Sequence, residues 1–149
     1  MATIRLTKVF NFAMAHALHN YDGLCKNIHG HSYHFEVTVV GRPNDDESSP
    51  KKGMLIDFSV LKKLINRELI DHLDHSLMLS QESDPALIQL LQKNYEKIIL
   101  VPFQPTTENM LSYFAEKIKA VLPPDVQLFS LKLKETDNSF AEWFGSDNQ

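Results

Sequence analysis

The stretch TIRLTKVFNFAMAH, residues 3–16, alternates between apolar and other side chains along most of its length. The stretch HSYHFEVTVV, residues 31–40, alternates in the same way and is rich in aromatic and β-branched side chains. A period of two is typical of a β-strand with one buried face. The sequence therefore predicts two strands here, and we expect them to pair antiparallel.

The chain that follows these strands contains a polar loop and then apolar residues at the spacing of helices and short strands. Residues 41–53 are polar and rich in turn formers, which indicates an exposed loop. Asp57 is the predicted N-cap of a long helix that follows the loop. Apolar spacing predicts helices at 56–73, 84–93 and 106–121 and short strands at 98–101, 126–135 and 140–144.

The order of these elements favours one fold class. Strands and helices do not interleave as they do in βαβ units. We therefore predict an α+β fold with an antiparallel four-stranded sheet and two long helices on one face. With 149 residues and no internal repeat or linker, residues 1–149 are expected to form one domain.

Composition excludes several classes of function. Hydrophobic residues make up 43% and charged residues 23%, as in an ordinary globular protein. The formal charge of −4 argues against a nucleic-acid partner. A single cysteine cannot form an internal disulfide, and no apolar stretch suits a signal peptide or a membrane span. We expect a cytoplasmic protein with no membrane partner.

Three of the seven histidines lie where the two predicted strands would meet. In an antiparallel pair the end of the first strand lies beside the start of the second, so His16 approaches His29 and His31. All three continue the apolar side of their strands. A His-x-His pair with a third His supplies three nitrogens to Zn²⁺ and leaves a fourth position open. The spacing therefore predicts a zinc site.

The alternative is that these are isolated surface or core histidines. Two further histidines, His19 and His34, lie near this set in the sequence. His34 has the opposite parity to His31 and is predicted not to be a ligand. His19 lies three residues beyond the first strand and is a weaker competitor.

Cys25 lies between His16 and His29 in the sequence. Spacing alone leaves three roles open for it. It is an inert apolar residue, the fourth ligand of a closed Cys-His₃ site, or a nucleophile or base beside the metal.

Carboxylates and histidines also occur in pairs at the end of the first predicted helix. Asp71-His72 and Asp74-His75 are both candidate dyads, in which the carboxylate orients the imidazole. Such residues are also common at helix ends for solubility and dipole reasons. Glu135 shares the parity of the apolar residues of its strand, so it is expected to point inward and to need a partner.

Six short motifs follow one another along nearly the whole chain. They are FNFAMAH at 10–16, CKNIHGH at 25–31, GMLIDF at 53–58, LDH at 73–75, PTTEN at 105–109 and KET at 134–136. In this order they resemble the 6-pyruvoyltetrahydropterin synthase and 6-carboxytetrahydropterin synthase family. The resemblance implies a tunnelling fold (T-fold), in which the sheets of neighbouring subunits join in a barrel. It also implies a homohexamer, built as a dimer of trimers, with active sites at subunit interfaces.

The resemblance assigns roles to the histidines and the cysteine. It implies that His16, His29 and His31 are the zinc ligands and that Cys25 is the catalytic base. The three-residue gap between Cys25 and His29 is similar to that of the bacterial 6-carboxytetrahydropterin synthases of queuosine biosynthesis, and animal pyruvoyl enzymes usually have a longer gap.

Other matches concern the proton relay and the pterin. Asp74 and His75 match the relay dyad, because the family motif has a Leu directly before the Asp and Leu73 stands there. Glu135 matches the carboxylate that binds the pterin edge and is sometimes also assigned to the relay. The residues that match the helix start near the pterin are Thr107 and, beside it, Thr106 and Glu108. Leu79, where the family often has Asn, and the long segment 80–104 depart from the pattern.

The resemblance implies that a pterin triphosphate is the substrate. The expected reaction converts 7,8-dihydroneopterin triphosphate to 6-carboxy-5,6,7,8-tetrahydropterin, with release of acetaldehyde and triphosphate. Zn²⁺ is the expected cofactor, and no nucleotide-binding motif suggests a nicotinamide. The alternative enzyme is the pyruvoyl synthase, which keeps the side chain, and a remote alternative is a non-catalytic zinc-binding module.

Overall fold

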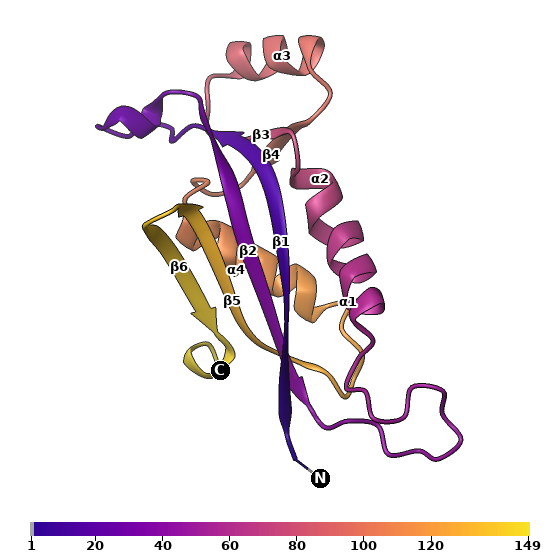
Figure 1. The fold of residues 1–149 in the computed structure, drawn as a ribbon. Helices are drawn as coiled ribbons and strands as arrows, with labels where there is room; N and C mark the ends of the chain where they lie inside the picture. Colours follow the sequence, from indigo (N-terminus) through magenta and orange to yellow (C-terminus); the bar gives the residue numbers. More distant parts are fainter. Residues whose placement is uncertain (1) are drawn as a thin grey trace.

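The computed structural model describes residues 2–149, and within them the strands form a six-stranded mixed sheet in the order β4-β3-β1-β2-β5-β6 (Figure 1). The strands are β1 (Ile4–His16), β2 (His29–Gly41), β3 (Ser76–Ser80), β4 (Ile98–Val101), β5 (Gln127–Thr136) and β6 (Ser139–Phe144). The two longest strands, β1 and β2, lie at the centre of this sheet.

The predicted antiparallel four-stranded sheet is wrong. Strands β1, β2, β5 and β6 are antiparallel neighbours, but β3 runs parallel to β1 and β4 runs parallel to β3. Strand β3 has only five residues, of which four are buried, so it lacks the alternation that identifies a one-sided strand. The structure therefore extends the sheet by two parallel strands on one side.

The predicted pairing of the first two strands is confirmed. Strands β1 and β2 are antiparallel over their whole length, and His16 lies opposite His29. Alternate side chains of both strands are buried, from Phe10 to His16 in β1 and from Tyr33 to Val39 in β2. The long hairpin therefore has one core face and one outer face.

The described residues contain three helical segments, close to the three predicted ranges. The first is continuous and comprises α1 (Phe58–Ile65), a π-helical turn η2 (Asn66–Ile70) and α2 (Asp71–Leu73). The others are α3 (Pro85–Asn94) and α4 (Thr107–Lys119), and short 3₁₀ turns lie at η1 (Leu24–Lys26) and η3 (Gly145–Asp147). Asp57 caps α1 as predicted, because its side chain accepts a hydrogen bond from Ser59 N–H at 2.8 Å.

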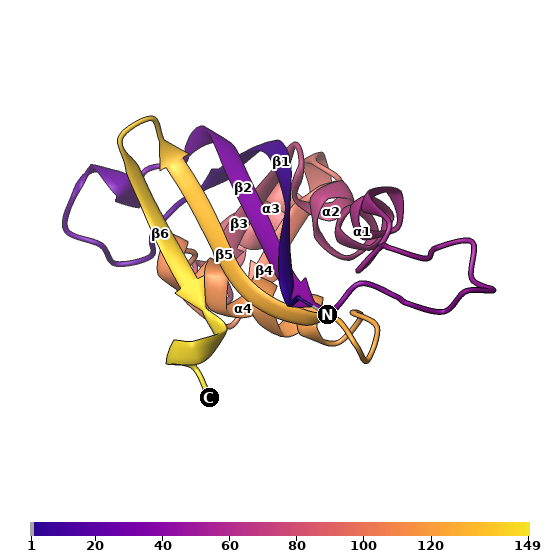
Figure 2. The ribbon, with the colours of Figure 1, turned by 60° about the horizontal axis from the view of Figure 1, so that its bottom comes forward.

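The segment α1–α2 and helix α4 pack on the same face of the sheet (Figure 2). Phe35 of β2 and Phe114 of α4 meet edge to face, with ring centroids 5.5 Å apart. Helix α3 contributes no buried side chain and lies apart from this core, beyond the end of β1 (Figure 1). The hydrophobic core thus lies between the hairpin and the two long helical segments.

None of the helices in residues 2–149 is long and apolar enough to cross a membrane.

Candidate metal centre

Four side chains with metal-binding atoms converge where β1 ends and β2 begins. His16 is the last residue of β1, and His29 and His31 are near the start of β2. Glu135 lies near the end of β5, the neighbour of β2. One nitrogen or oxygen atom of each residue lies within 4.8 Å of those of the other three. The structure thus brings together the three predicted histidines and the predicted inward carboxylate.

Backbone carbonyls orient two of the imidazoles. His16 Nδ1 lies 2.7 Å from Pro105 O, and His29 Nδ1 lies 2.7 Å from Asn27 O. Because a carbonyl oxygen only accepts hydrogen bonds, each Nδ1 is the donor and carries the proton. In the neutral rings, both Nε2 atoms then keep a free lone pair, which is the usual arrangement of a metal-binding histidine.

The distance between these two Nε2 atoms indicates what fits between the rings. His16 Nε2 and His29 Nε2 are 3.1 Å apart. Two lone pairs facing each other at this distance repel, unless a cation or a proton lies between them. The tautomers imposed by the carbonyls therefore fit a bound metal ion.

Burial favours the metal-binding form of two histidines. His16 is 2% exposed, and this burial lowers its pKa. The pKa of His31 is also lowered, again mainly by burial. Both rings are therefore neutral at neutral pH, which is the protonation state that binds a metal ion.

The fourth member of the cluster, Glu135, is held by helix α4. Its Oε1 lies 2.7 Å from His31 Nε2 but is not aligned for a hydrogen bond, and the described residues offer this buried nitrogen no partner. Glu135 Oε2 accepts a hydrogen bond of 2.6 Å from Thr107 Oγ1. A carboxylate beside three imidazole nitrogens adds negative charge, so the donor set suits a divalent cation.

Cys25 lies apart from this cluster. It is half-buried in the 3₁₀ turn η1, within the loop 17–28 that connects β1 and β2. Among the described residues, its sulfur does not belong to the group of atoms within 4.8 Å of one another. The arrangement therefore gives no support to a closed Cys-His₃ site.

The Asp74-His75 pair forms a dyad at the start of β3. Asp74 Oδ2 lies 3.0 Å from His75 Nδ1, and Asp74 Oδ1 accepts a hydrogen bond of 2.9 Å from Ala13 N–H. That backbone hydrogen bond is the main reason why the pKa of Asp74 is lowered. Lys97 Nζ donates to the carbonyl oxygens of Asp71 and Asp74, so it holds the end of α2 beside the dyad.

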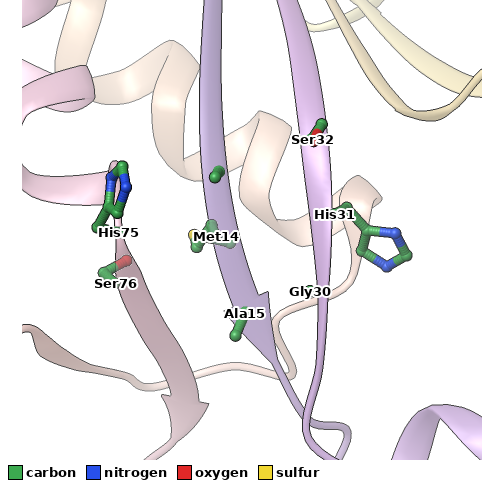
Figure 3. A pocket seen from close by; sticks show the side chains of 8 residues that line it. Met14, Ala15, Gly30, His31, Ser32, His75 and Ser76 are labelled. Atoms are coloured by element: carbon green, nitrogen blue, oxygen red, sulfur yellow. The ribbon is translucent and has the colours of Figure 1, made fainter.

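The dyad and the histidine cluster lie on different sides of the sheet. Figure 3 shows His31 and His75 on opposite sides of β1 and β2, with their rings pointing apart. His75 borders a hollow of about 450 Å³ together with residues 13–15 and 30–32. The side chains of Ala13 and Ser32 belong to the outer face, whereas the cluster belongs to the core face. Within one chain, the sheet therefore separates the two groups.

The remaining candidate histidines lie outside the cluster. His34 is on the outer face, where its Nδ1 lies 3.1 Å from Asn11 Oδ1 and its Nε2 lies 3.4 Å from Glu36 Oε2. His19 is half-buried in the loop 17–28. His72 is exposed at the end of α2, and the described residues show no ion pair between it and Asp71.

The three predicted residues at the start of α4 differ in their contacts. Thr106 is its N-cap, accepting a hydrogen bond of 3.2 Å from Asn109 N–H, and Glu108 is exposed in the first turn. Thr107 alone of the three predicted residues there contacts the cluster, through Glu135.

Sequence reasoning missed the supporting contacts of the site. The carbonyls of Asn27 and Pro105 carry no residue-type signal, since every residue has one. Lys97 lies in a segment with no recognisable motif. The sequence did indicate a contact for Glu135. This residue shares the parity of the apolar residues of its strand, and an inward carboxylate needs a partner.

A family model for 6-pyruvoyl tetrahydropterin synthase matches residues 5–146. Together with the sheet and the histidine cluster, this match defines the class of protein: the chain belongs to the 6-pyruvoyl tetrahydropterin synthase family. It is similar to proteins named 6-carboxy-5,6,7,8-tetrahydropterin synthase. That of Haemophilus influenzae is 36% identical over 141 residues, which are 93% of this chain and 97% of the relative. That of Rickettsia typhi is 32% identical over 93% of this chain and 99% of its own length.

Solved structures have a similar fold. The 6-pyruvoyl tetrahydropterin synthase of Caenorhabditis elegans matches with a TM-score of 0.69 at 28% identity, over 97% of both chains. An uncharacterized protein of Wolinella succinogenes matches with a TM-score of 0.76 at 21% identity, over 97% of this chain and 99% of its own. The second likeness concerns the fold alone.

Proposed function

We propose that the protein is a zinc-dependent lyase, a 6-carboxytetrahydropterin synthase of queuosine biosynthesis. The reaction converts 7,8-dihydroneopterin triphosphate and one water molecule to 6-carboxy-5,6,7,8-tetrahydropterin, acetaldehyde and triphosphate. The observation that carries the proposal is the convergence of His16, His29 and His31, in which the tautomers of His16 and His29 leave their Nε2 lone pairs free. The names of the relatives that are 36% and 32% identical support the carboxy product.

In this proposal, His16, His29 and His31 hold the zinc ion. When bound, the metal supplies Lewis-acid polarisation of the substrate's side-chain hydroxyls, which makes protons on the adjoining carbons easier to remove. Three imidazole nitrogens with an open fourth position are the usual donor set of a catalytic zinc site. The carbonyls of Pro105 and Asn27 keep two of the rings in the orientation that this role requires.

Glu135 binds the pterin in this proposal. A carboxylate accepts hydrogen bonds from the 2-amino group and ring N–H of a pterin edge. The hydroxyl of Thr107 holds one of its oxygens at 2.6 Å, so the carboxylate is fixed before the substrate binds. We infer from this contact that Thr107 acts on the substrate through Glu135.

Two groups move protons. Cys25, as a thiolate, takes one proton from the substrate side chain, and His75 moves another. Asp74 orients His75, because its second oxygen is itself fixed by Ala13 N–H. The left-handed backbone of His75, with φ of 64°, further restricts where its ring can lie.

We further propose a homohexamer, a dimer of trimers, with active sites between subunits. The separation of the dyad from the histidine cluster within one chain supports this arrangement (Figure 3). An oligomer brings the dyad of one chain to the cluster of its neighbour. We also propose that residues 1–149 are one domain and that it works in the cytoplasm on a small pterin, without nucleic-acid or membrane partners.

The second candidate is 6-pyruvoyltetrahydropterin synthase, which eliminates triphosphate and keeps the side chain intact. The 28% identity with the 6-pyruvoyl tetrahydropterin synthase of Caenorhabditis elegans supports this second candidate. The two reactions share triphosphate release, so phosphate assays do not distinguish them.

Product analysis distinguishes the two reactions. The zinc-loaded protein is incubated with 7,8-dihydroneopterin triphosphate, the pterin is identified by mass spectrometry and acetaldehyde is trapped as a hydrazone. We expect a 6-carboxy pterin and one acetaldehyde per turnover. A main product that retains the three-carbon side chain would assign the pyruvoyl reaction instead.

A further inference from the structure

The side chain of Gln104 forms two hydrogen bonds with a single residue of the loop 17–28. Its Oε1 accepts a hydrogen bond of 2.9 Å from His19 N–H. Its Nε2 donates a short hydrogen bond to His19 O. Both polar backbone groups of His19 are thus engaged by one planar amide, which restrains the orientation of the loop as well as its position.

Gln104 is itself firmly held at the start of α4. Its carbonyl oxygen accepts hydrogen bonds from Thr106 N–H at 2.7 Å and from Asn109 Nδ2 at 3.0 Å. Thr106 and Asn109 belong to the cap and first turn of α4, a helix whose apolar face is buried in the core. The Gln104 amide therefore extends from a rigid part of the molecule to a loop.

The loop that Gln104 holds carries Cys25. Leu18, the neighbour of His19, donates its N–H to Cys25 O at 2.9 Å. The half-buried Cys25 is thus hydrogen-bonded to Leu18, which directly precedes the residue that Gln104 restrains.

The same short segment also holds two members of the histidine cluster. Pro105 O contacts His16 Nδ1 at 2.7 Å, and Thr107 Oγ1 donates to Glu135 at 2.6 Å. Residues 104–107 therefore contact the cysteine loop, a proposed metal ligand and the proposed pterin-binding carboxylate. This segment links the relative positions of the three groups.

We propose that Gln104 is a positioning residue that keeps Cys25 at its working distance from the metal centre. The proposal rests on the proposed function, in which Cys25 is the base. Gln104 contacts His19 rather than the cluster, so its loss displaces the thiol and leaves the metal ligands and the pterin-binding carboxylate in place. Small misplacements of a reacting group reduce the rate strongly. The expected effect is therefore on kcat and on the exposure of Cys25, with little effect on KM or metal content.

Gln104→Met tests this with a side chain of similar size and no hydrogen bonds. Gln104→Glu retains the acceptor for His19 N–H but lacks the donor for His19 O. Gln92→Met, at an exposed position of α3, is the matched control. Zinc content, kcat, KM and the alkylation rate of the zinc-loaded protein by iodoacetamide are measured for each variant. Since the chain has one cysteine, the alkylated mass reports Cys25 alone.

For Gln104→Met we expect a fall in kcat of about tenfold or more, with KM changed by less than about twofold. Its alkylation should be faster by about threefold or more, because the loop opens more often. Gln104→Glu should lie between Gln104→Met and wild type, and Gln92→Met should match wild type.

Several results would overturn the inference. Wild-type kcat and alkylation in Gln104→Met would show that the clamp, the pair of hydrogen bonds between Gln104 and His19, does not position Cys25. Loss of zinc or of cooperative unfolding in both Gln104 variants would assign Gln104 a purely structural role. Wild-type turnover in Cys25→Ala would overturn the proposed base, and with it the role of the clamp. Full loss of turnover in Cys25→Ala beside an unaffected Gln104→Met would overturn the clamp alone.

Discussion

At the scale of single residues, the histidine cluster depends on hydrogen bonds made by the atoms that do not bind metal. The carbonyls of Pro105 and Asn27 place a proton on Nδ1 of His16 and His29, which frees both Nε2 atoms. Such contacts orient the rings before any ion arrives, so they contribute to affinity without touching the metal.

We predict that His16→Ala, His29→Ala and His31→Ala each weaken zinc binding by at least about a hundredfold. Removal of a hydrogen-bond partner of a metal ligand usually costs less affinity than this. His34→Ala is the control, because His34 lies on the outer face and binds Asn11 and Glu36. Elemental analysis and competition with a chromogenic chelator measure the effect. Full zinc content in the three variants would show that the cluster is not the metal site.

The second prediction at this scale concerns pH. The pKa of Asp74 is lowered mainly by the hydrogen bond from Ala13 N–H, with a smaller effect of His75. A carboxylate with a lowered folded pKa stabilises the fold above its unfolded pKa of about 4, and this contribution is lost as the pH falls through the folded pKa. The contribution is small because the Asp74 side chain is 40% exposed.

We therefore expect Asp74→Asn to lower the Tm by about 1–3 °C near neutral pH. The difference from wild type should begin to shrink below about pH 4 and should be lost as the pH falls through the lowered folded pKa of Asp74. Thermal unfolding followed by circular dichroism across this range measures it. Asp71→Asn, which removes an exposed carboxylate from α2, should follow wild type. A difference that stays constant in acid would contradict the electrostatic explanation.

At the scale of elements, the site is built where the β1–β2 hairpin meets the start of α4. The hairpin supplies the three histidines, and the residues before and inside α4 supply the Pro105 carbonyl and Thr107. Helix α4 reaches this position because its apolar face packs on the sheet, notably through Phe114 against Phe35. Core packing and site geometry are therefore coupled.

We predict that Phe114→Ala lowers the free energy of unfolding by about 3–5 kcal/mol, the usual cost of removing a fully buried aromatic ring. Phe114 is 0% exposed. Phe114→Leu should cost less, and both variants should bind zinc more weakly in proportion to the loosening of α4. Denaturation by urea measures stability. Leu90→Ala on α3 is the control, since Leu90 is 59% exposed and its loss should cost less than about 0.5 kcal/mol.

At the scale of the whole molecule, the sheet keeps the Asp74-His75 dyad away from the histidine cluster (Figure 3). In the proposed hexamer, an active site that uses both groups would combine residues of two chains. This arrangement leads to a prediction that does not depend on the identity of the product.

We predict that Cys25→Ala and His75→Ala are each inactive alone and active when mixed. Random co-assembly in equal amounts should restore about a quarter of wild-type activity, because half of the chains supply an intact Cys25 and half of their neighbours supply an intact His75. The two variants are unfolded and refolded together, and turnover is compared with that of each refolded alone. A mixture as inactive as its components would mean that both groups act within one chain.

Much of this protein could be predicted from local patterns. The alternation of residues 3–16 and 31–40 determined both central strands and their buried faces, because a strand repeats every two residues. The same parity placed the three histidines on one side. Asp57 as a helix cap and the positions of α3 and α4 also followed from short-range signals, since caps and helical faces depend on residues within a few positions.

Only the tertiary structure decided the features that depend on residues far apart in the sequence. Strand β3 joins the sheet parallel to β1, and β4 joins it parallel to β3, which short strands without alternation do not reveal. Gln104 meets His19, and Thr107 meets Glu135, across gaps that no periodicity spans. Local sequence determines which face of an element is apolar, but long-range packing selects which elements meet. The surroundings of the candidate metal centre therefore belong to the fold as a whole.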